Sequence, residues 1–284
     1  MNHLSIILPA KNEAPALAEL LPRLRAAHPE AEITVVDDGS TDDTRRICAE
    51  AGVACLSSPY SMGNGASIKR GARAAEGEVL VFMDGDGQHD AADVARLLAK
   101  LGEGYDMVVG ARDWSSQAGV GRGVANSLYN WLATRMTGHQ VADLTSGFRA
   151  VRADKFREFL YLLPNGFSYP TTSTMAFFRS AYPVAYVPIK AAQRVGKSHI
   201  KPIKDGIRFL LIIFKIATLY SPLKLFVPAS ALFFLLGCAN YAWTFMHDGR
   251  LTNGSTLLWS GAAIVFLIGL VSEQITALTY RRDA

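Results

Sequence analysis

Short apolar runs alternate with segments of helical spacing along the first 110 residues of the chain. Five runs have the length of strands and are apolar almost throughout, as expected for strands buried on both faces of a parallel sheet. They cover residues 4–8, 32–36, 53–56, 79–83 and 105–110, and another follows at 182–189. Successive parallel strands need a crossover, usually a helix. The pattern therefore predicts an α/β domain with a doubly wound, mostly parallel sheet.

Helical spacing fills the intervals between the expected strands. The expected helices cover residues 14–27, 63–75, 91–101 and 124–136. A further helix is expected after the second strand, with Ser40 or Thr41 at its N-cap. Past Gly110 the strand–helix alternation weakens, so the sequence says less about the second half of the domain.

The pattern changes after position 205, where apolar residues become concentrated. Within 203–220, Lys204, Arg208 and Lys215 fall on one helical face and apolar residues fall on the other. A basic amphipathic helix of this kind is typical of an element that lies in the membrane interface. We therefore expect residues 203–222 to form an interfacial helix that ends at Ser221-Pro222.

Two apolar segments follow, at 225–245 and 256–278. Each is close to the roughly 20 residues needed to span a bilayer, which predicts a transmembrane helical hairpin. Lysines precede the first segment, and Arg281 and Arg282 follow the second, whereas the connecting loop holds only Arg250. The positive-inside rule therefore predicts a two-span membrane protein with its globular domain and both termini in the cytoplasm.

The composition agrees with a division into a globular part and a membrane part, and it gives information on the class of binding partner. Hydrophobic residues make up 50% of the chain, which is high for a soluble protein, and the formal net charge of +4 gives no support for a nucleic-acid partner. The three cysteines, Cys48, Cys55 and Cys238, lack metal or disulfide spacing, which fits a reducing compartment. The N-terminal apolar run is followed at once by Lys11 and is too short for a signal peptide.

Polar clusters follow three of the expected strands. They are Lys11-Asn12-Glu13, Asp37-Asp38 and Asp84-Gly85-Asp86. The carboxyl ends of parallel strands lie along one edge of the sheet, where ligands of open α/β sheets bind. We therefore expect the three clusters to lie close together and, with the glycine-bordered helix start at 63–65, to bind a nucleotide.

The third cluster offers the ligands of a divalent metal ion. Asp84, Asp86 and Gln88 would present two carboxylates and a carboxamide from one turn. Mg²⁺ and Mn²⁺ prefer such oxygen ligands, and Mg²⁺ is usually shared with substrate phosphates. The alternative is a polar turn without a metal, because Asp and Gly are common turn residues.

A glycine-rich segment offers a second possible phosphate contact. Gly63, Gly65 and Lys69 would let backbone N–H groups and an ammonium group approach a phosphate at a helix start. The spacing is neither that of a Walker A loop nor that of a dinucleotide fingerprint, so an ordinary loop stays open as the alternative.

In combination, these motifs resemble the family 2 glycosyltransferases of the polyprenyl-phosphate (dolichol-phosphate mannose synthase-like) group. The matching motifs cover nearly all of residues 4–200: Pro9-Ala-Lys-Asn-Glu13, Val36-Asp-Asp-Gly-Ser-Thr-Asp42, Gly63-Asn-Gly65, Asp84-Gly-Asp-Gly-Gln88, Thr145-Ser-Gly-Phe148 and Arg194-Val-Gly-Lys-Ser198. The chain departs from the family at Lys11, where an aromatic residue beside the nucleobase is common, and this leaves uracil and guanine both open. The absence of Gln-x-x-Arg-Trp, a motif of processive polysaccharide synthases, favours transfer of a single sugar.

The resemblance implies a GT-A fold, a nucleoside-diphosphate sugar donor, Mg²⁺ or Mn²⁺, and inverting transfer of one hexose to a polyprenyl phosphate. It implies that the nucleotide sugar is bound by Pro9, Lys11, Glu13, Asp37, Asp38, Gly65, Lys69 and Asp84. It assigns the metal to Asp84, Asp86 and Gln88, and the acceptor phosphate to Arg112, Arg122, Arg194 and Ser198. Asp86, Asp143 and Arg122 form the implied catalytic set.

These residue types suit the implied reaction. A divalent metal would stabilise the charge that develops on the nucleoside-diphosphate leaving group. The nucleophile would be a phosphate oxygen that is already ionised, so it needs positioning more than a strong general base. Arginines grip phosphate through their planar forks, although each arginine taken alone could equally form a surface ion pair.

The expected organisation is therefore a GT-A glycosyltransferase domain over 1–202, an interfacial helix over 203–222 and a hairpin over 223–284. Three alternatives stay open: a glycosyltransferase with another lipid acceptor, a nucleotidyltransferase that uses the same pocket, and a non-catalytic membrane module that binds nucleotide sugars. Loss of a metal ligand would mark the last one, and all three expected ligands are present. The hairpin also offers a surface for a homo-oligomer. The sugar, the exact polyprenyl acceptor and the pathway stay open.

Overall fold

The computed structural model describes residues 3–112, 120–166, 168–190 and 221–279, with single positions at 211, 214, 215, 218 and 220. For residues 120–125 and 248 it describes the backbone alone. The chain divides into two compact units, Met1–Ile212 and Ile213–Ala284. The first is an α/β unit and the second is a helical hairpin.

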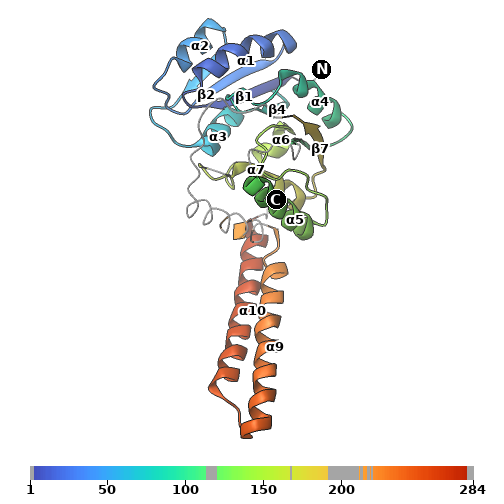
Figure 1. Ribbon diagram of the computed structural model, residues 1–284. Coiled ribbons are helices and arrows are strands. Elements are labelled where there is room, and N and C mark those ends of the chain that lie inside the picture. Colours follow the sequence, from blue (N-terminus) through green and yellow to red (C-terminus); the bar gives the residue numbers. More distant parts are fainter. Residues whose placement is uncertain are drawn as a thin grey trace. The chain divides into compact units, whose positions relative to one another are not determined.

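A seven-stranded sheet organises the α/β unit, in the order β3-β2-β1-β4-β6-β5-β7 (Figure 1). The strands are β1 Leu4–Ala10, β2 Glu32–Asp37, β3 Ala54–Ser57, β4 Val79–Phe82, β5 Met107–Arg112, β6 Arg149–Arg152 and β7 Val184–Ile189. Within the described residues, β6 alone is antiparallel to its neighbours β4 and β5, and the other pairs are parallel. The mostly parallel sheet predicted from the apolar runs is confirmed.

Helices cover both faces of this sheet. They are α1 Ala14–Ala27, α2 Thr44–Glu50, α3 Asn64–Ala74, α4 Ala91–Leu101, α5 Val120–Thr137, α6 Ala153–Arg157 and α7 Tyr169–Arg179. Side chains alternate between the faces of a strand. Ile6 and Leu8 accordingly join the main core with residues of α1 and α4. Ile7 points to the other face, where α3 packs so closely that a Cβ on Gly71 would lie 2.4 Å from the Ile7 side chain.

The start of α2 corrects one local expectation. Neither Ser40 nor Thr41 caps this helix, which begins at Thr44 after Asp43. The Ser40 N–H donates to the Asp37 carboxylate at 2.8 Å, and the Thr41 N–H donates to the Asn12 side-chain oxygen at 2.8 Å. The two residues therefore form a loop that joins two strand ends, and the helix starts only after it.

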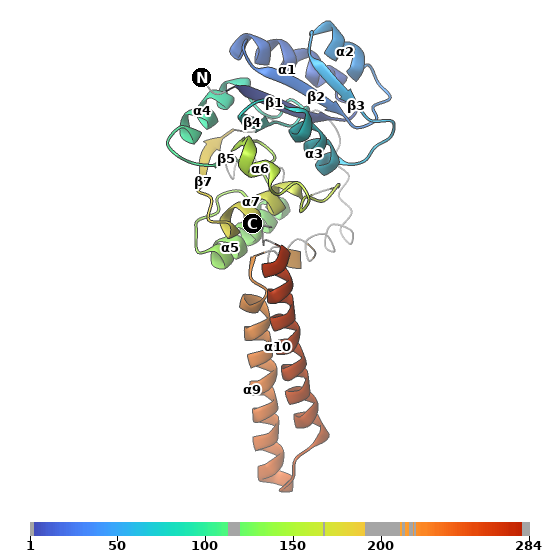
Figure 2. The same ribbon diagram turned by 180° about the vertical axis from the view of Figure 1, so that it is seen from behind.

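The hairpin consists of two long helices, α9 Leu223–Asp248 and α10 Asn253–Thr279 (Figures 1 and 2). Both are long and apolar enough to cross a membrane, with mean hydropathies of 1.7 and 1.9. Large apolar side chains along them are exposed, as expected for helices covered by lipid. The expected interfacial helix over 203–222 lies almost wholly outside the described residues and stays a prediction.

Small residues allow the two helices to approach closely. A Cβ on Gly237 would lie 2.6 Å from the Trp259 ring, and a Cβ on Gly269 would lie 2.6 Å from the Phe226 side chain. The Ser230 hydroxyl donates to the Ala262 carbonyl oxygen at 2.8 Å. Small residues and interhelical hydrogen bonds are the usual sources of helix association in lipid, where the hydrophobic effect between helices is absent.

A carboxylate on α10 holds the start of α9. Glu273 accepts hydrogen bonds from the Ser221 hydroxyl at 3.0 Å and from the Leu223 N–H at 3.2 Å. The first N–H groups of a helix have no partner within the helix, and a negative charge there interacts favourably with the helix dipole. One turn further along α10, the Thr276 hydroxyl donates to the Thr218 carbonyl oxygen at 2.8 Å. Glu273 therefore fastens the entry into the hairpin.

We predict that Glu273→Ala lowers the unfolding free energy of the detergent-solubilised chain by about 1–3 kcal/mol, because it leaves an N–H group and a hydroxyl without their charged acceptor. Loss of helical circular dichroism on titration with sodium dodecyl sulfate measures the effect. Gln274→Ala is the matched control, since the neighbouring Gln274 is exposed. Equal unfolding curves for the two variants would show that Glu273 does not fasten the hairpin.

Candidate functional site

The three polar clusters lie at one edge of the sheet, as predicted. Strand β1 pairs in parallel with β2 on one side and with β4 on the other. Beyond the paired residues, the Asp38 N–H donates to the Ala10 carbonyl oxygen at 2.9 Å, and the Gly85 N–H donates to the Pro9 carbonyl oxygen at 3.2 Å. The backbone of β1 therefore bonds directly to both acidic clusters. Lys11 is exposed and Glu13 is half-buried beside them.

Asn12 joins the first two clusters, a structural role that the sequence interpretation did not assign to it. Its backbone is left-handed, with φ of 55°, which asparagine tolerates better than most residues. Its side-chain oxygen accepts from the Thr41 N–H, and its own N–H donates to the Ser40 hydroxyl at 2.9 Å. Asp42 adds a third link by accepting from the Ala14 N–H at 3.1 Å. The sequence signal was a lone asparagine in a polar turn between a strand and a helix.

Asp37 has no exposed surface. It accepts from the Ser40 N–H and, at 2.7 Å, from Arg45 Nε. Burial raises the pKa of Asp37, but the hydrogen bonds from Ser40 and Arg45 outweigh it and hold the pKa below its usual value. The carboxylate is therefore charged, and its bonds lie within the protein.

Asp38 is also buried and organises the next loop. It accepts from the Ser61 hydroxyl and the Met62 N–H, both at 2.6 Å, and from the Gly63 N–H at 3.0 Å. These bonds fix the segment that leads into α3. The two acidic residues at the end of β2 thus shape the loops around the edge, and direct contact of either one with a nucleoside stays a prediction.

The Gly63-Asn64-Gly65 motif packs against the segment 163–166. The Gly65 N–H donates to the Gly166 carbonyl oxygen at 3.2 Å, and a Cβ on Gly65 would lie 1.9 Å from the Pro164 carbonyl oxygen. Lys69 reaches the same segment, where its ammonium group donates to the Leu163 carbonyl oxygen at 3.2 Å and to the Asn165 side chain. A contact of Gly65 or Lys69 with phosphate stays a prediction, because in the structure both residues contact the segment 163–166.

The turn after β4 presents the expected metal ligands. The Asp84 side chain is 34% exposed, and Asp86 and Gln88 are half-buried. Asp86 accepts from the Gln88 N–H at 3.2 Å, which closes the turn. A Cβ on Gly147 would lie 3.0 Å from Asp84 Oδ2, so a glycine there leaves room for the carboxylate. The two carboxylates and the carboxamide are therefore accessible from one turn.

This donor set fits a divalent metal that shares its coordination with other oxygen ligands. Within the described residues, no three His, Cys, Asp or Glu side chains form a group that could hold a metal alone. Asp84, Asp86 and Gln88 supply hard oxygen ligands, and phosphate and water oxygens would complete the shell, as is usual for Mg²⁺.

His89 lies behind this turn and was missed by the sequence interpretation. Its side chain is 5% exposed, and its Nε2 lies 3.9 Å from Asp84 Oδ2. The ring stacks on Phe148 with the centroids 4.8 Å apart. His89 therefore lies beside Asp84 on the inner side of the turn, beyond hydrogen-bond distance. The sequence signal for His89 was its position five residues after Asp84.

Arg112 and Asp143 form an ion pair at the end of β5, in which Asp143 is buried and Arg112 is partly exposed. Arg112 Nε donates to Asp143 Oδ2 at 2.8 Å, and Nη2 donates to Oδ1 at 3.1 Å. Asp143 also accepts from the N–H groups of Arg112, Thr145 and Ser146. Burial raises the pKa of Asp143, but these bonds outweigh it and keep the pKa below its usual value. Asp143 is thus a charged acceptor that positions Arg112 and the following turn, and it is a poor general base.

Arg149, another residue that was not predicted, holds the turn after Asp143 from the interior of the domain. It is fully buried, and its Nη1 donates to the Ser173 hydroxyl at 2.7 Å and to the Pro170 carbonyl oxygen at 3.1 Å, both on α7. Its Nη2 donates to the Ser146 carbonyl oxygen. Burial lowers the pKa of Arg149. The arginine ties α7 to the turn that faces Asp84.

The other arginine predictions cannot be placed. Arg194 and Ser198 lie outside the described residues, and Arg122 is described only as a backbone position in α5. Of the residues predicted to hold the acceptor phosphate, Arg112 alone has a described side chain, and it lies at the same sheet edge as Asp84.

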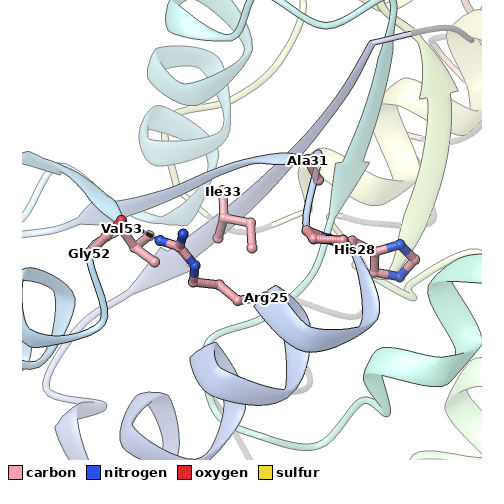
Figure 3. Close-up of a pocket in the computed structure, with 7 residues that line it drawn as sticks. Arg25, His28, Ala31, Ile33, Gly52 and Val53 are labelled. Atoms are coloured by element: carbon pink, nitrogen blue, oxygen red, sulfur yellow. Dashed lines mark hydrogen bonds between the residues drawn. The ribbon is translucent and has the colours of Figure 1, made fainter.

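A hollow of about 110 Å³ lies at the opposite, amino edge of the sheet, between the end of α1 and the starts of β2 and β3 (Figure 3). Arg25 crosses it and donates to the Gly52 carbonyl oxygen at 2.6 Å. Its lining comprises Arg25, His28, Pro29, Ala31, Ile33, Gly52 and Val53. None of these is a predicted site residue, so the hollow is separate from the site.

Comparison with known proteins identifies the family. A sequence model of glycosyl transferase family 2 matches residues 5–160. The chain belongs to this family. A second model, the GtrB C-terminal hairpin, matches residues 221–278. The chain is therefore a family 2 glycosyltransferase with a C-terminal hairpin of two apolar helices.

Curated relatives cover different shares of the chain. An undecaprenyl-phosphate mannosyltransferase of Micrococcus luteus is 31% identical over 207 residues, which are 68% of this chain and 85% of that protein. The glycosyltransferase AglJ of Haloferax volcanii is 28% identical over 227 residues, which are 78% of this chain and 74% of the relative. An undecaprenyl-phosphate 4-deoxy-4-formamido-L-arabinose transferase of Klebsiella pneumoniae is 34% identical over 158 residues. Here the chain spans about half the length of the relative, 48%.

Solved structures support the fold. Glucosyl-3-phosphoglycerate synthase of Mycobacterium tuberculosis, solved with Mn²⁺, uridine diphosphate and phosphoglyceric acid, has a TM-score of 0.61 at 22% identity. The match covers 76% of this chain and 78% of that one. At this identity the likeness concerns the fold, and it agrees with the GT-A fold expected from the motifs.

The packing of Gly65 generates a first prediction for the site. Gly65→Ala should destabilise the chain by about 1–3 kcal/mol or more, because the added methyl group would collide with backbone. The thermal unfolding midpoint of the purified chain measures the effect, and Asn64→Ala, at an exposed neighbour, is the control. If Gly65 serves only to admit a phosphate, the variant will instead keep its midpoint and lose affinity for the donor.

The Arg112–Asp143 pair generates a prediction for pH dependence. Asp143→Asn should cost about 3 kcal/mol, because it leaves Arg112 without its charged partner. A carboxylate with a lowered folded-state pKa stabilises the fold above its unfolded pKa, and this contribution is lost as pH falls through the folded pKa. The stability gap between the parent chain and the variant should therefore be constant near neutral pH and narrow below pH 3.8, the ordinary value for Asp.

Unfolding midpoints measured across a pH series test this expectation. Glu30→Gln serves as a control at an exposed carboxylate. A gap that widens as the pH falls would mean that Asp143 is protonated in the folded protein, which is the opposite of the sign derived from its hydrogen bonds.

Proposed function

We propose that the chain transfers one hexose from a UDP- or GDP-sugar to a polyprenyl phosphate, with inversion, at the cytoplasmic face of a membrane. The observation that carries the proposal is that one chain contains both an accessible Asp84/Asp86/Gln88 turn and a hairpin of two helices long and apolar enough to cross a membrane. Relatives that match 68% and 52% of the chain are named for transfer to undecaprenyl phosphate. A lipid-phosphate acceptor explains why a family 2 glycosyltransferase carries apolar helices.

Asp84, Asp86 and Gln88 would hold Mg²⁺ or Mn²⁺ between the protein and the donor diphosphate. The metal would supply Lewis-acid stabilisation of the leaving diphosphate. The accessibility of the turn and its oxygen ligands support this assignment, and Gly147 leaves room for the Asp84 carboxylate itself.

Arg112 would position the acceptor phosphate. Its guanidinium is held from one side by Asp143 through Nε and Nη2, and Nη1 makes no hydrogen bond within the part of the chain that the structure describes. The side chain is 28% exposed. A fixed, partly exposed guanidinium can bind a phosphate without the cost of ordering a free side chain. Arg122, Arg194 and Ser198 would complete this binding site.

Asp143 would act through Arg112 and not as a base. Its oxygens already accept several hydrogen bonds, and its pKa lies below the usual value because these bonds outweigh the effect of burial. A phosphate nucleophile is ionised at neutral pH and needs no proton removed.

The nucleoside would lie near Pro9, Lys11 and Glu13, over loops that Asp37 and Asp38 hold in place.

The remaining assignments follow from the sequence. We propose a GT-A domain over 1–202, an interfacial helix over 203–222 and a hairpin over 223–284, with both termini in the cytoplasm because Arg281 and Arg282 follow the second span. Association of hairpins into a homo-oligomer is compatible with their exposed apolar surface.

The proposal predicts that the purified chain moves label from a UDP- or GDP-sugar into undecaprenyl phosphate in the presence of Mn²⁺, and that EDTA abolishes the transfer. Asp86→Ala should lower the rate by about 100-fold or more, because a metal ligand supports several kcal/mol of charge stabilisation. Extraction of labelled lipid measures transfer, and a panel of donors identifies the sugar and base.

Glu103→Gln is the control for Asp86→Ala, since Glu103 is an exposed carboxylate in the turn before β5. Release of pyrophosphate in place of nucleoside diphosphate would identify a nucleotidyltransferase. Binding of nucleotide sugar with no product from any donor would favour the non-catalytic module. Product on another lipid would replace the polyprenyl acceptor.

A further inference from the structure

Two of the three cysteines lie side by side on one face of the sheet. Cys48 is one of the two buried residues of α2 and has no exposed surface. Cys55 pairs with Val35 across the β2–β3 ladder, and it packs against the core cluster that contains both Val35 and Cys48. The Val53 N–H donates to the Cys48 carbonyl oxygen at 3.0 Å and holds the end of α2 near the start of β3. The fold thus brings together two thiols whose spacing in the sequence predicted no disulfide.

The two thiols share a hydrogen bond and differ in their environment. The bond lowers the pKa of Cys55 to about 6 and raises the pKa of Cys48. Burial adds to the rise at Cys48, whereas at Cys55 the bond outweighs the effect of burial. The Cys55 side chain is only half-buried. Cys55 is therefore the thiolate that a small reagent can reach, and Cys48 is the neutral thiol behind it.

A low-pKa thiolate next to a second thiol is the arrangement of redox-sensing cysteines. In a reducing compartment such a pair is reduced at rest, and its disulfide is transient. We propose that Cys48 and Cys55 form a modification site for a hydroperoxide, at which Cys55 reacts first and Cys48 then closes a disulfide between α2 and β3. Cys238 lies on α9, in the other unit of the chain, and takes no part.

The reaction balances in two steps. The Cys55 thiolate attacks one oxygen of hydrogen peroxide, so that an S–O bond forms, the O–O bond breaks and hydroxide leaves, to become water with a proton from solvent. The Cys48 sulfur then attacks the Cys55 sulfur, so that the S–S bond forms, the S–O bond breaks and water leaves with the Cys48 proton. The two sulfurs lose two electrons in total, and the peroxide is reduced to two waters. A dithiol reductant reverses the change by thiol–disulfide exchange.

The cysteine pair is connected to Asp37 at the candidate site. Cys55 Sγ lies 3.6 Å from the Ser57 hydroxyl oxygen, and the Ser57 side chain hydrogen-bonds to Asp37. Arg45, one turn before Cys48 on α2, donates to the same carboxylate at 2.7 Å. The disulfide therefore forms beside the bonds that hold the loop after β2. The inference goes beyond the proposed function, because it requires neither a sugar donor nor an acceptor.

Peptide mapping of the full chain in detergent tests this site. The chain carries Cys238→Ser, so that Cys48 and Cys55 are its only cysteines. The folded protein is treated with hydrogen peroxide, its free thiols are blocked with iodoacetamide, and it is then denatured and digested with an endopeptidase that cleaves after glutamate. Glu50 lies between the two cysteines, so cleavage there leaves two peptides that only a disulfide holds together.

The expected result is a linked pair of peptides in the mass spectrum, which dithiothreitol separates. Cys48→Ala, in the same background, should accumulate a sulfenic acid on Cys55 that dimedone labels. Cys55→Ser should leave Cys48 without a dimedone label, because the buried thiol is neutral and does not react first. The Cys238→Ser chain alone decides whether the disulfide forms, even if either further variant fails to fold.

Blocked thiols at both positions after peroxide treatment would overturn the proposal. A disulfide between two copies of the chain, or one that forms only in urea, would also overturn it, because the native contact would then not be its cause. A dimedone label on Cys48 in Cys55→Ser would overturn the order of the two steps. The assay contains no donor and no acceptor, so its failure is distinguishable from failure of the proposed function.

Discussion

The loops at the carboxyl edge of the sheet depend on buried aspartates. A loop beyond the end of a strand has lost its ladder partners, and its N–H groups need other acceptors. Asp38 and Asp143 supply them, each accepting at least two N–H or hydroxyl bonds from the segment that follows, and Asp37 accepts from the Ser40 N–H and the Arg45 side chain. A charged acceptor makes a stronger bond than a neutral one, so a few side chains can hold a whole loop. Without them, neither Arg112 nor the start of α3 would be fixed.

Much of this fold could be predicted from the sequence because its strands are buried on both faces and its crossovers are regular. The apolar runs located β1 to β5 and β7 within a few residues, and the helical spacing gave α1 and α4 with their observed bounds. The convergence of three polar clusters followed from a general property of parallel sheets. These predictions rest on periodicity, which is strongest where burial is complete.

The missed elements lack that periodicity. Strand β6 is four residues long with arginine at each end, and its burial depends on Arg149 finding partners on α7. Helix α7 is buried from Tyr169 to Phe177 and is rich in threonine and serine, so it shows no apolar stripe. Both elements are stabilised by tertiary contacts between residues far apart in the chain. No local pattern in a single sequence indicates such contacts.

Burial also decides which aspartates can bind a ligand, and the sequence alone does not distinguish them. Asp37, Asp38, Asp84 and Asp86 all lie at the carboxyl ends of buried strands, yet the first two are enclosed and the last two are accessible. A diphosphate brought to Asp84 and Asp86 would meet two carboxylates of its own sign of charge, and Arg112 already pairs with Asp143. The proposed divalent cation would remove this repulsion. Donor and metal should therefore stabilise each other on the protein, each binding more tightly when the other is present.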